Sequence, residues 1–154
     1  MTVIKSRQNS LIRSVRALHN NKVRRVKQKF LVEGVRLLEE AVSSGCTIDT
    51  LLYCPEMTTD SLGQALIQKL VHKGIPVVAT TPAVLASVAE TDSPQGLVAV
   101  VRFPSLPPID PIIANTDLIV LGDRIQDPGN AGTIIRTSEA AGAGGVFFTP
   151  GSVF

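Results

Sequence analysis

Strand-like and helix-like segments alternate along most of the chain, and this alternation constrains the fold more than any other feature. Gly96 to Phe103 is an almost unbroken run of apolar and β-branched residues, which is typical of a strand buried on both faces. Segments with apolar residues at helical spacing precede and follow such runs. The pattern predicts an α/β fold with a largely parallel sheet and helices on its faces.

The expected elements follow from apolar spacing and from residues that cap helices. Ser10 is expected to cap the first helix, with Leu11, Val15 and Leu18 facing inward. Glycines are expected to end later helices because they favour the left-handed conformation at a C-terminus. We predict helices at about 10–20, 22–28, 35–44, 61–73, from 82 and 129–141, and strands at about 30–33, 48–54, 75–79, 96–103, 117–122 and 145–149.

The composition changes between Phe103 and Asn115. The eight residues from Pro104 include four prolines, which remove backbone donors and favour extended polyproline geometry. We expect one domain at 1–103, a proline-rich linker at 104–116 and a partial second domain at 117–154. A single strand–helix–strand unit cannot cover its own sheet, so further residues or a partner chain are expected to complete it. We interpret the chain as a fragment.

The sequence does not support a membrane-spanning, secreted, disulfide-rich or metal-binding protein. A run of about 18 uninterrupted apolar residues is absent, as is an apolar segment behind a basic start, so we predict a cytoplasmic protein without a membrane span or a secretory signal. Cys46 and Cys54 are too few for a disulfide framework or a four-ligand zinc site. His19 and His72 lack metal-ligand spacing and are expected on exposed helix faces, so no metal is predicted.

The basic residues are concentrated at the amino terminus. Residues 1–32 contain nine Lys and Arg side chains and no acid, whereas the remainder contains six bases and all thirteen acids, giving +9 followed by −7. Such a segment is expected where a protein contacts a phosphate backbone, because each cation near a phosphate releases condensed counterions. A solvated helix face and an organelle transit peptide are the alternatives.

A second candidate site follows the apolar run Leu118 to Leu121. The run ends at Gly122 and a polar loop, and a helix is expected from near Pro128 with Ile134, Ile135 and Ser138 facing the core. In open α/β sheets, ligands bind beyond the carboxyl ends of the strands. The polar residues there or one to two helical turns away are Asp123, Arg124, Asp127, Asn130 and Arg136.

The same residues have ordinary structural interpretations. Asn130 is a possible helix cap, Asp127-Pro-Gly a possible turn, and Arg136 a possible surface side chain. Glu33 and Gly34 are expected to cap the helix that follows them rather than to contact a ligand.

The residues also resemble a known family. Asp127-Pro-Gly-Asn130, then Gly132-Thr-Ile-Ile-Arg136-Thr, is similar to the first motif of SpoU-type (TrmH-like) RNA 2′-O-ribose methyltransferases of the SPOUT superfamily. The upstream segments resemble the family's amino-terminal substrate-binding domain, and they are Ser6-Arg-Gln-Asn9, Phe30-Leu-Val-Glu33-Gly34-Val-Arg36-Leu-Leu-Glu-Glu-Ala41 and Ser93-Pro-Gln-Gly96-Leu-Val-Ala-Val.

The resemblance implies a small α/β RNA-binding domain followed by the start of a parallel-sheet SPOUT (α/β knot) domain. It implies methyl transfer from S-adenosylmethionine to a ribose 2′-hydroxyl of ribosomal or transfer RNA, with Arg136 and Asn130 at the active site and a homodimeric assembly. The knotted cofactor-binding motifs of the family lie beyond Phe154, so the knot region is absent and the cofactor-binding residues are unknown. We therefore expect the chain alone to be inactive.

We expect a group of mainly basic residues to contact RNA. They are Arg7, Asn9, Arg13, Lys22, Arg24, Arg25, Lys27 and Arg124. Two other functions remain open: a non-catalytic RNA-binding module and a small-molecule α/β enzyme with an incidental loop match.

Overall fold

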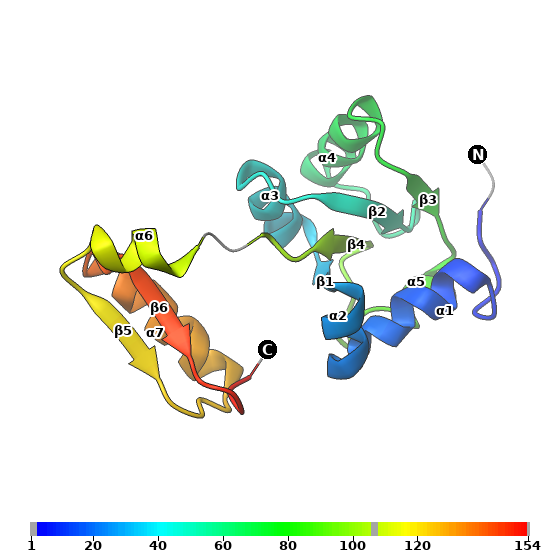
Figure 1. The fold of residues 1–154 in the computed structure, drawn as a ribbon. Coiled ribbons are helices and arrows are strands. Elements are labelled where there is room, and N and C mark those ends of the chain that lie inside the picture. The colour runs from blue at the N-terminus through cyan, green and yellow to red at the C-terminus, as the bar shows by residue number, and fades with distance from the viewer. Residues whose placement is uncertain (1–2, 106–107, 154) are drawn as a thin grey trace. The chain divides into compact units, whose positions relative to one another are not determined.

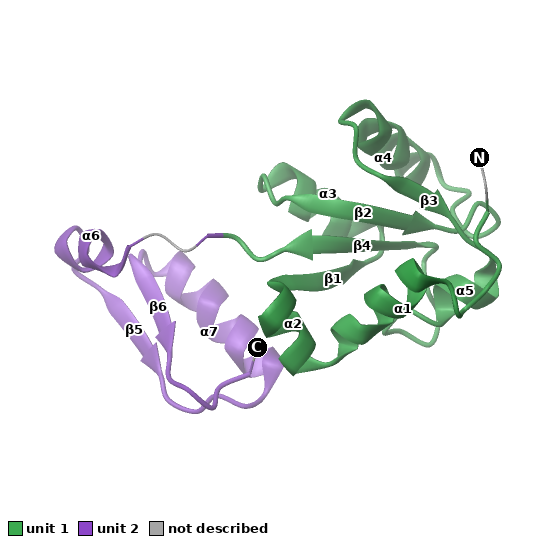
Figure 2. Ribbon diagram, turned by 45° about the vertical axis from the view of Figure 1, so that its right-hand side comes forward, with its two compact units in different colours: residues 1–104 green, residues 105–154 purple. Residues whose placement is uncertain are grey.

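The computed structural model describes residues 3–105 and 108–153. It divides into two compact units, Met1–Pro104 and Ser105–Phe154 (Figure 2). None of the helices within these described residues is both long and apolar enough to cross a membrane.

The first unit is built on a mixed four-stranded sheet in the order β1-β4-β2-β3. Its strands are β1 (Lys29–Glu33), β2 (Ile48–Tyr53), β3 (Val77–Ala79) and β4 (Leu97–Arg102). Only β2 and β3 are parallel, since β4 runs antiparallel to both β1 and β2. The prediction of a largely parallel sheet is therefore wrong for this unit. The continuous apolar run of β4 is explained by its central place, with five of its six residues buried.

Helices cover both faces of this sheet (Figure 1). They are α1 (Ser10–Arg16), the 3-10 helix η1 (Ala17–His19), α2 (Asn21–Lys27), α3 (Val35–Ser43), α4 (Ser61–His72) and α5 (Pro82–Ala86). One core lies between the sheet and α3 and α4, and includes Leu38, Leu51 and Leu70. The other lies between the opposite face and α1 and α5, and includes Ile12 and Leu85. The domain thus has an α/β/α layering.

The N-cap of the first helix lies one residue earlier than expected. The Asn9 side chain accepts a hydrogen bond of 2.9 Å from the Leu11 N–H, so Asn9 is the N-cap and Ser10 is the first helical residue. The buried stripe is Ile12, Val15 and Leu18, whereas Leu11 is only partly buried. This stripe fixes the basic segment on the sheet.

The second unit is a strand–helix–strand unit with one extra helix. Its elements are α6 (Ile109–Ala114), β5 (Ile119–Gly122), α7 (Pro128–Ala140) and β6 (Gly145–Phe148). Strands β5 and β6 are parallel, as the resemblance implied for this part of the chain. Ala131 and Ser138 are the buried residues of α7, while Ile135 is 49% exposed, contrary to its expected core position.

Helix α6 corrects the expectation of an extended linker over 104–116. It begins after Pro108 and includes Pro111 in its first turn, where the N–H groups have no partner within the helix. A proline at this position therefore removes no helical hydrogen bond. Pro107, which belongs to the same proline-rich stretch, lies outside the described residues.

Candidate nucleic-acid interface and candidate active site

The start of the chain is fixed to the domain through two arginines. Arg7 Nε donates to the Ala83 carbonyl at 3.1 Å, and Arg16 Nη2 donates to the Arg7 carbonyl at 2.6 Å. Arg13 is exposed on α1, and the Asn9 amide oxygen is used as the helix cap. The structure therefore anchors Arg7 by one donor and leaves Arg13 on the surface.

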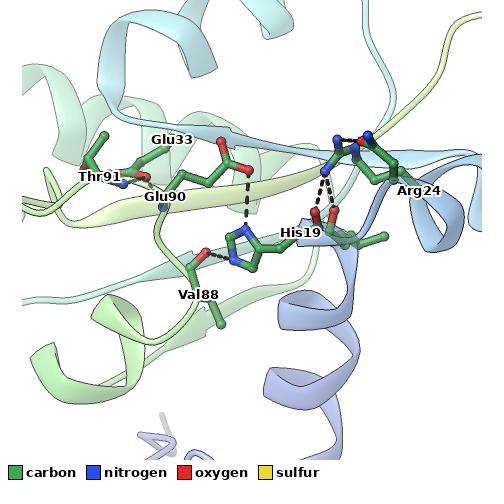
Figure 3. Close-up of polar contacts among 8 residues, drawn as sticks. His19, Arg24, Glu33, Val88, Glu90 and Thr91 are labelled. Atoms are coloured by element: carbon green, nitrogen blue, oxygen red, sulfur yellow. Dashed lines mark hydrogen bonds and ion pairs between the residues drawn. The ribbon is translucent and has the colours of Figure 1, made fainter. Parts of the chain in front are cut away.

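Helix α2 presents Lys22, Arg25 and Lys27 at the surface, whereas Arg24 is partly buried. Arg24 Nη1 donates to the carbonyl oxygens of Leu18 and His19, each at 2.9 Å. Its Nη2 group donates to the Asn21 amide oxygen (Figure 3). These bonds satisfy the carbonyls at the end of η1, so the Arg24 guanidinium holds α2 in place beside η1.

His19 connects the end of η1 to the loop after α5 (Figure 3). Its Nε2 atom lies 3.2 Å from the Val88 carbonyl oxygen, and its Nδ1 atom lies 3.4 Å from Glu90 Oε1. The expectation that His19 is simply solvent-exposed is wrong, because its side chain is only 32% exposed and has two partners. Sequence reasoning missed this because both partners are more than 60 residues away along the chain.

Glu33 fastens the same loop to the end of β1 (Figure 3). Its carboxylate accepts the Glu90 N–H at 2.7 Å, the Thr91 N–H at 3.2 Å and the Thr91 hydroxyl. The expectation that Glu33 caps the following helix is wrong. Gly34 alone is the N-cap, with φ +87°, a left-handed conformation that glycine adopts without strain.

A groove of about 440 Å³ lies between the basic helices and the sheet of the first unit. Its walls and rim are formed by side chains of α1, η1, α2, β1, β2 and β4. The residues are Leu11, Ser14, Val15, Ala17, Leu18, Val23, Lys27, Lys29, Asp49, Thr50, Val100 and Arg102. No feature of the sequence indicated this groove, because it depends on how α1 and α2 pack on the sheet.

An ion-pair cluster occupies the polar end of this groove. Asp49 pairs with Lys29 and, at 2.5 Å, with Arg102 Nε. Burial by itself raises the pKa of Asp49, but the hydrogen bonds and charges of Lys29 and Arg102 outweigh it, and the pKa lies below its usual range. The carboxylate is therefore ionised and holds both cations at the groove.

In the second unit, the loop after β5 is bound to the loop after β6. Asp123 accepts the Thr149 hydroxyl at 2.6 Å, and Thr149 Oγ1 in turn accepts the Arg124 N–H at 3.0 Å. Further along, the Ser152 hydroxyl accepts the Ile125 N–H at 3.1 Å. Arg124 adopts φ +49° and its exposed side chain lies 3.5 Å from Asp123. These bonds fix the loop that leads into α7.

The side chain of Arg136 lies along α7 and extends toward the N-terminal half of the helix. The Asp127 carboxylate caps the helix by accepting the Asn130 N–H at 2.7 Å, so the cap is Asp127 and not Asn130, which was the possible cap in the sequence. Arg136 Nη2 donates to Thr133 Oγ1 at 3.3 Å, and a Cβ placed on Gly132 would lie 3.3 Å from Nη1. The guanidinium thus points back toward the helix N-terminus, where unpaired N–H groups favour anions.

The structure therefore brings Arg136 toward Thr133 rather than toward Asn130. Both Asn130 and Arg136 are exposed, and among the contacts of the described residues none joins their side chains. Sequence reasoning missed Thr133, although its position three residues before Arg136 puts the two side chains on one helix face.

The comparisons with known proteins agree with this architecture. Residues 9–99 match the model of the MRM3-like substrate binding domain. The chain belongs to this family. It is 32% identical, over 99% of its length, to the 23S rRNA (guanosine(2553)-2′-O)-methyltransferase RlmP of Bacillus subtilis, of which it covers 56%.

Two solved structures are similar to the chain across both units. An AdoMet-bound rRNA methyltransferase from Sinorhizobium meliloti has a TM-score of 0.77 and 29% identity, over 99% of this chain and 56% of that one. The SpoU methyltransferase AviRb from Streptomyces viridochromogenes, in complex with AdoMet, has a TM-score of 0.75 and 32% identity, over 95% and 53%. They confirm the α/β fold and the SpoU resemblance. The chain spans about half the length of the curated relatives that it matches.

Proposed function

We propose that the chain forms the substrate-binding domain and the first catalytic segment of a ribosomal RNA 2′-O-ribose methyltransferase that uses S-adenosylmethionine. One structural observation supports this most directly: the Arg136 guanidinium points back along α7 toward Gly132 and Thr133, on the helix that Asp127 caps. The names of the relatives, which match both units, support the same reaction.

The proposed chemistry of Arg136 follows from its charge and shape. A ribose 2′-hydroxyl is a weak nucleophile, so a site must stabilise the negative charge that develops on its oxygen. The guanidinium is a permanent cation with five N–H donors in a planar fork, and only one of them is used on Thr133 in the described contacts. The remaining donors are suited to the 2′-oxygen and an adjacent phosphate. Asn130, in the first turn of the helix, is proposed to orient the ribose.

S-adenosylmethionine supplies the methyl group when it is bound. The described residues near α7 do not by themselves make a site for it. The groove along α7 is lined by the aliphatic residues Val120, Ile134 and Ala141, and its polar groups are the hydroxyls of Thr133, Thr137 and Ser138. None of these lining side chains is a carboxylate that could face the sulfonium, and none is an amide that could bind the edge of the adenine. We therefore assign no step of the reaction to this groove.

RNA is proposed to bind the first unit through the exposed cations of α1 and α2. Arg13, Lys22, Arg25 and Lys27 are exposed, and no acidic residue occurs before Glu33. Residues 1–32 contribute no acid to this surface, which favours contact with a phosphate backbone. Binding is expected to weaken with added salt, with a log–log slope of about −0.7 for each phosphate contact to a single strand.

We also propose that the protein acts as a homodimer in the cytoplasm, where ribosomal RNA is available in a bacterial cell. Pairing is supported by large apolar side chains that remain exposed in the second unit. They are Ile109, Ile113, Leu118, Leu121 and Ile135, with Leu121 75% exposed.

Methyl transfer from radiolabelled S-adenosylmethionine to ribosomal RNA tests the proposal, using the protein that contains this chain. Replacing Arg136 with Ala is expected to lower the rate by about 10²- to 10³-fold, as for other removed charge-stabilising donors, while RNA affinity is retained. Glu139→Ala, on an exposed position of the same helix, is the control. Unchanged methylation in Arg136→Ala refutes the catalytic role. RNA binding without methylation in the unmodified protein would instead support a non-catalytic RNA-binding module.

A further inference from the structure

We infer that the groove between α1, α2 and the sheet binds one unpaired nucleotide of the RNA, with its base against the aliphatic wall and its phosphate at the cationic end. The inference rests on the proposed RNA-binding function of the first unit and names a specific site for it.

The apolar wall of the groove is preformed. Val15 and Leu18 of the α1–η1 segment and Val100 of β4 are at most 6% exposed, and they belong to the core on this face of the sheet. Leu11 and Val23 pack against the same core. Because core packing fixes these side chains, the groove does not need to form on binding, and its volume of about 440 Å³ is typical of ligand pockets, roughly 300 to 1,000 Å³.

The polar end of the groove is positively charged. Lys27, Lys29 and Arg102 line it together with one carboxylate, that of Asp49, which leaves an excess of two positive charges. Asp49 bonds to Lys29 and to Arg102 Nε, so it holds these cations in place without neutralising them all. The side chain of Arg102 is 59% exposed, and its Nη groups are suited to a phosphate.

An unpaired RNA nucleotide fits this combination better than another anion. An aliphatic wall can pack against the face of an unstacked base, and the hydroxyls of Ser14 and Thr50 line the groove, where they can contact a base edge. Exposed Lys22 and Arg25 lie on the adjoining helix α2, where they can meet the neighbouring phosphates of one strand. A base within a duplex would have to leave its stack to enter a groove with walls on both sides, so single-stranded RNA is the expected ligand.

Filling the groove tests the inference. Ser14→Phe places a ring in the groove without removing a cation. The matched control is Ser43→Phe, because both serines are exposed on a helix and both hydroxyls donate to the carbonyl three residues earlier. The probe is a single-stranded RNA of about twelve nucleotides with one 2-aminopurine, whose fluorescence rises when it leaves the stack. Circular dichroism checks that each variant is folded, and Ala17→Phe replaces Ser14→Phe if that variant is not.

The unmodified protein and Ser43→Phe are expected to raise 2-aminopurine fluorescence on binding. Ser14→Phe is expected to abolish the rise and to weaken affinity about fivefold, because the base loses its contact with the apolar wall. Equal affinity and an equal rise in Ser14→Phe overturn the groove site while leaving RNA binding by the first unit intact. Absence of RNA binding by the unmodified protein that contains this chain refutes the proposed function itself. Equally tight binding of free adenosine monophosphate overturns the assignment to an RNA nucleotide.

Discussion

Replacing Glu33 with Ala removes the carboxylate that holds the 90–91 segment to the end of β1. Three donors converge on this group: the N–H of Glu90, the N–H of Thr91 and the Thr91 hydroxyl. Val88 and Glu90 of the same loop also contact His19 at the end of η1. The substitution is therefore expected to release the 90–91 segment from the end of β1.

The expected loss of stability follows from these three bonds. A hydrogen bond contributes roughly 0.5 to 1.5 kcal/mol net, and both donor residues are exposed, so water replaces part of each lost bond. Taking the lower half of the range for each bond gives a loss of about 1.5 to 3 kcal/mol for Glu33→Ala. Glu33→Gln keeps one acceptor oxygen but turns an NH₂ group toward a donor, and is expected to lose about 1 kcal/mol.

Urea unfolding and amide hydrogen exchange measure the two parts of this prediction. The amides of Glu90 and Thr91 should exchange faster in Glu33→Ala than in the unmodified chain. The amides of the central strand β4 should remain more protected than those of the loop in both proteins. Glu39→Ala, at an exposed position on α3, is the control and should stay within about 0.5 kcal/mol of the unmodified chain. Unchanged exchange at both amides in Glu33→Ala would show that the carboxylate does not hold the loop.

Two further substitutions test other contacts. Burial raises the pKa of Asp49 but its ion pairs with Lys29 and Arg102 lower it overall, so its stabilisation is present above about pH 4 and is lost as the pH falls through the folded pKa. Acid titration of urea stability should therefore be flatter for Asp49→Asn, and an identical slope would contradict this. Gly144→Ala places a Cβ 2.3 Å from the Thr116 side chain and should destabilise the second unit by about 1 to 3 kcal/mol, which limited proteolysis would detect; unchanged cleavage would count against it.

Local patterns in the sequence predicted the elements better than their pairing. The apolar run over 96–103 correctly indicated a strand buried on both faces, which the structure has at Leu97–Arg102. Strand direction is not encoded in such a run, and the alternation of helices and strands suggested parallel crossovers throughout. The chain instead returns β4 between β1 and β2 in the opposite direction. The prolines of 104–111 were interpreted as extended backbone because their tolerance in a first helical turn depends on where the helix begins.

Only the local part of the candidate site could be predicted from the sequence. The spacing from Asp127 to Arg136 is local, so the sequence could place these residues on one helix and at its N-cap. The groove beside Lys29, Asp49 and Arg102 joins segments far apart in the chain, and its residues show no common pattern. The partners of Glu33 are likewise 57 and 58 residues away, which left helix capping as the expected role.

The central place of β4 has a consequence for how the first unit forms during synthesis. Its strands β1, β2 and β3 are made first, yet β1 has no pairing partner other than β4 in the described sheet. The ladder can close only after Arg102 has left the ribosome, so the nascent polypeptide exposes two uncovered strand edges until nearly the whole unit has been translated.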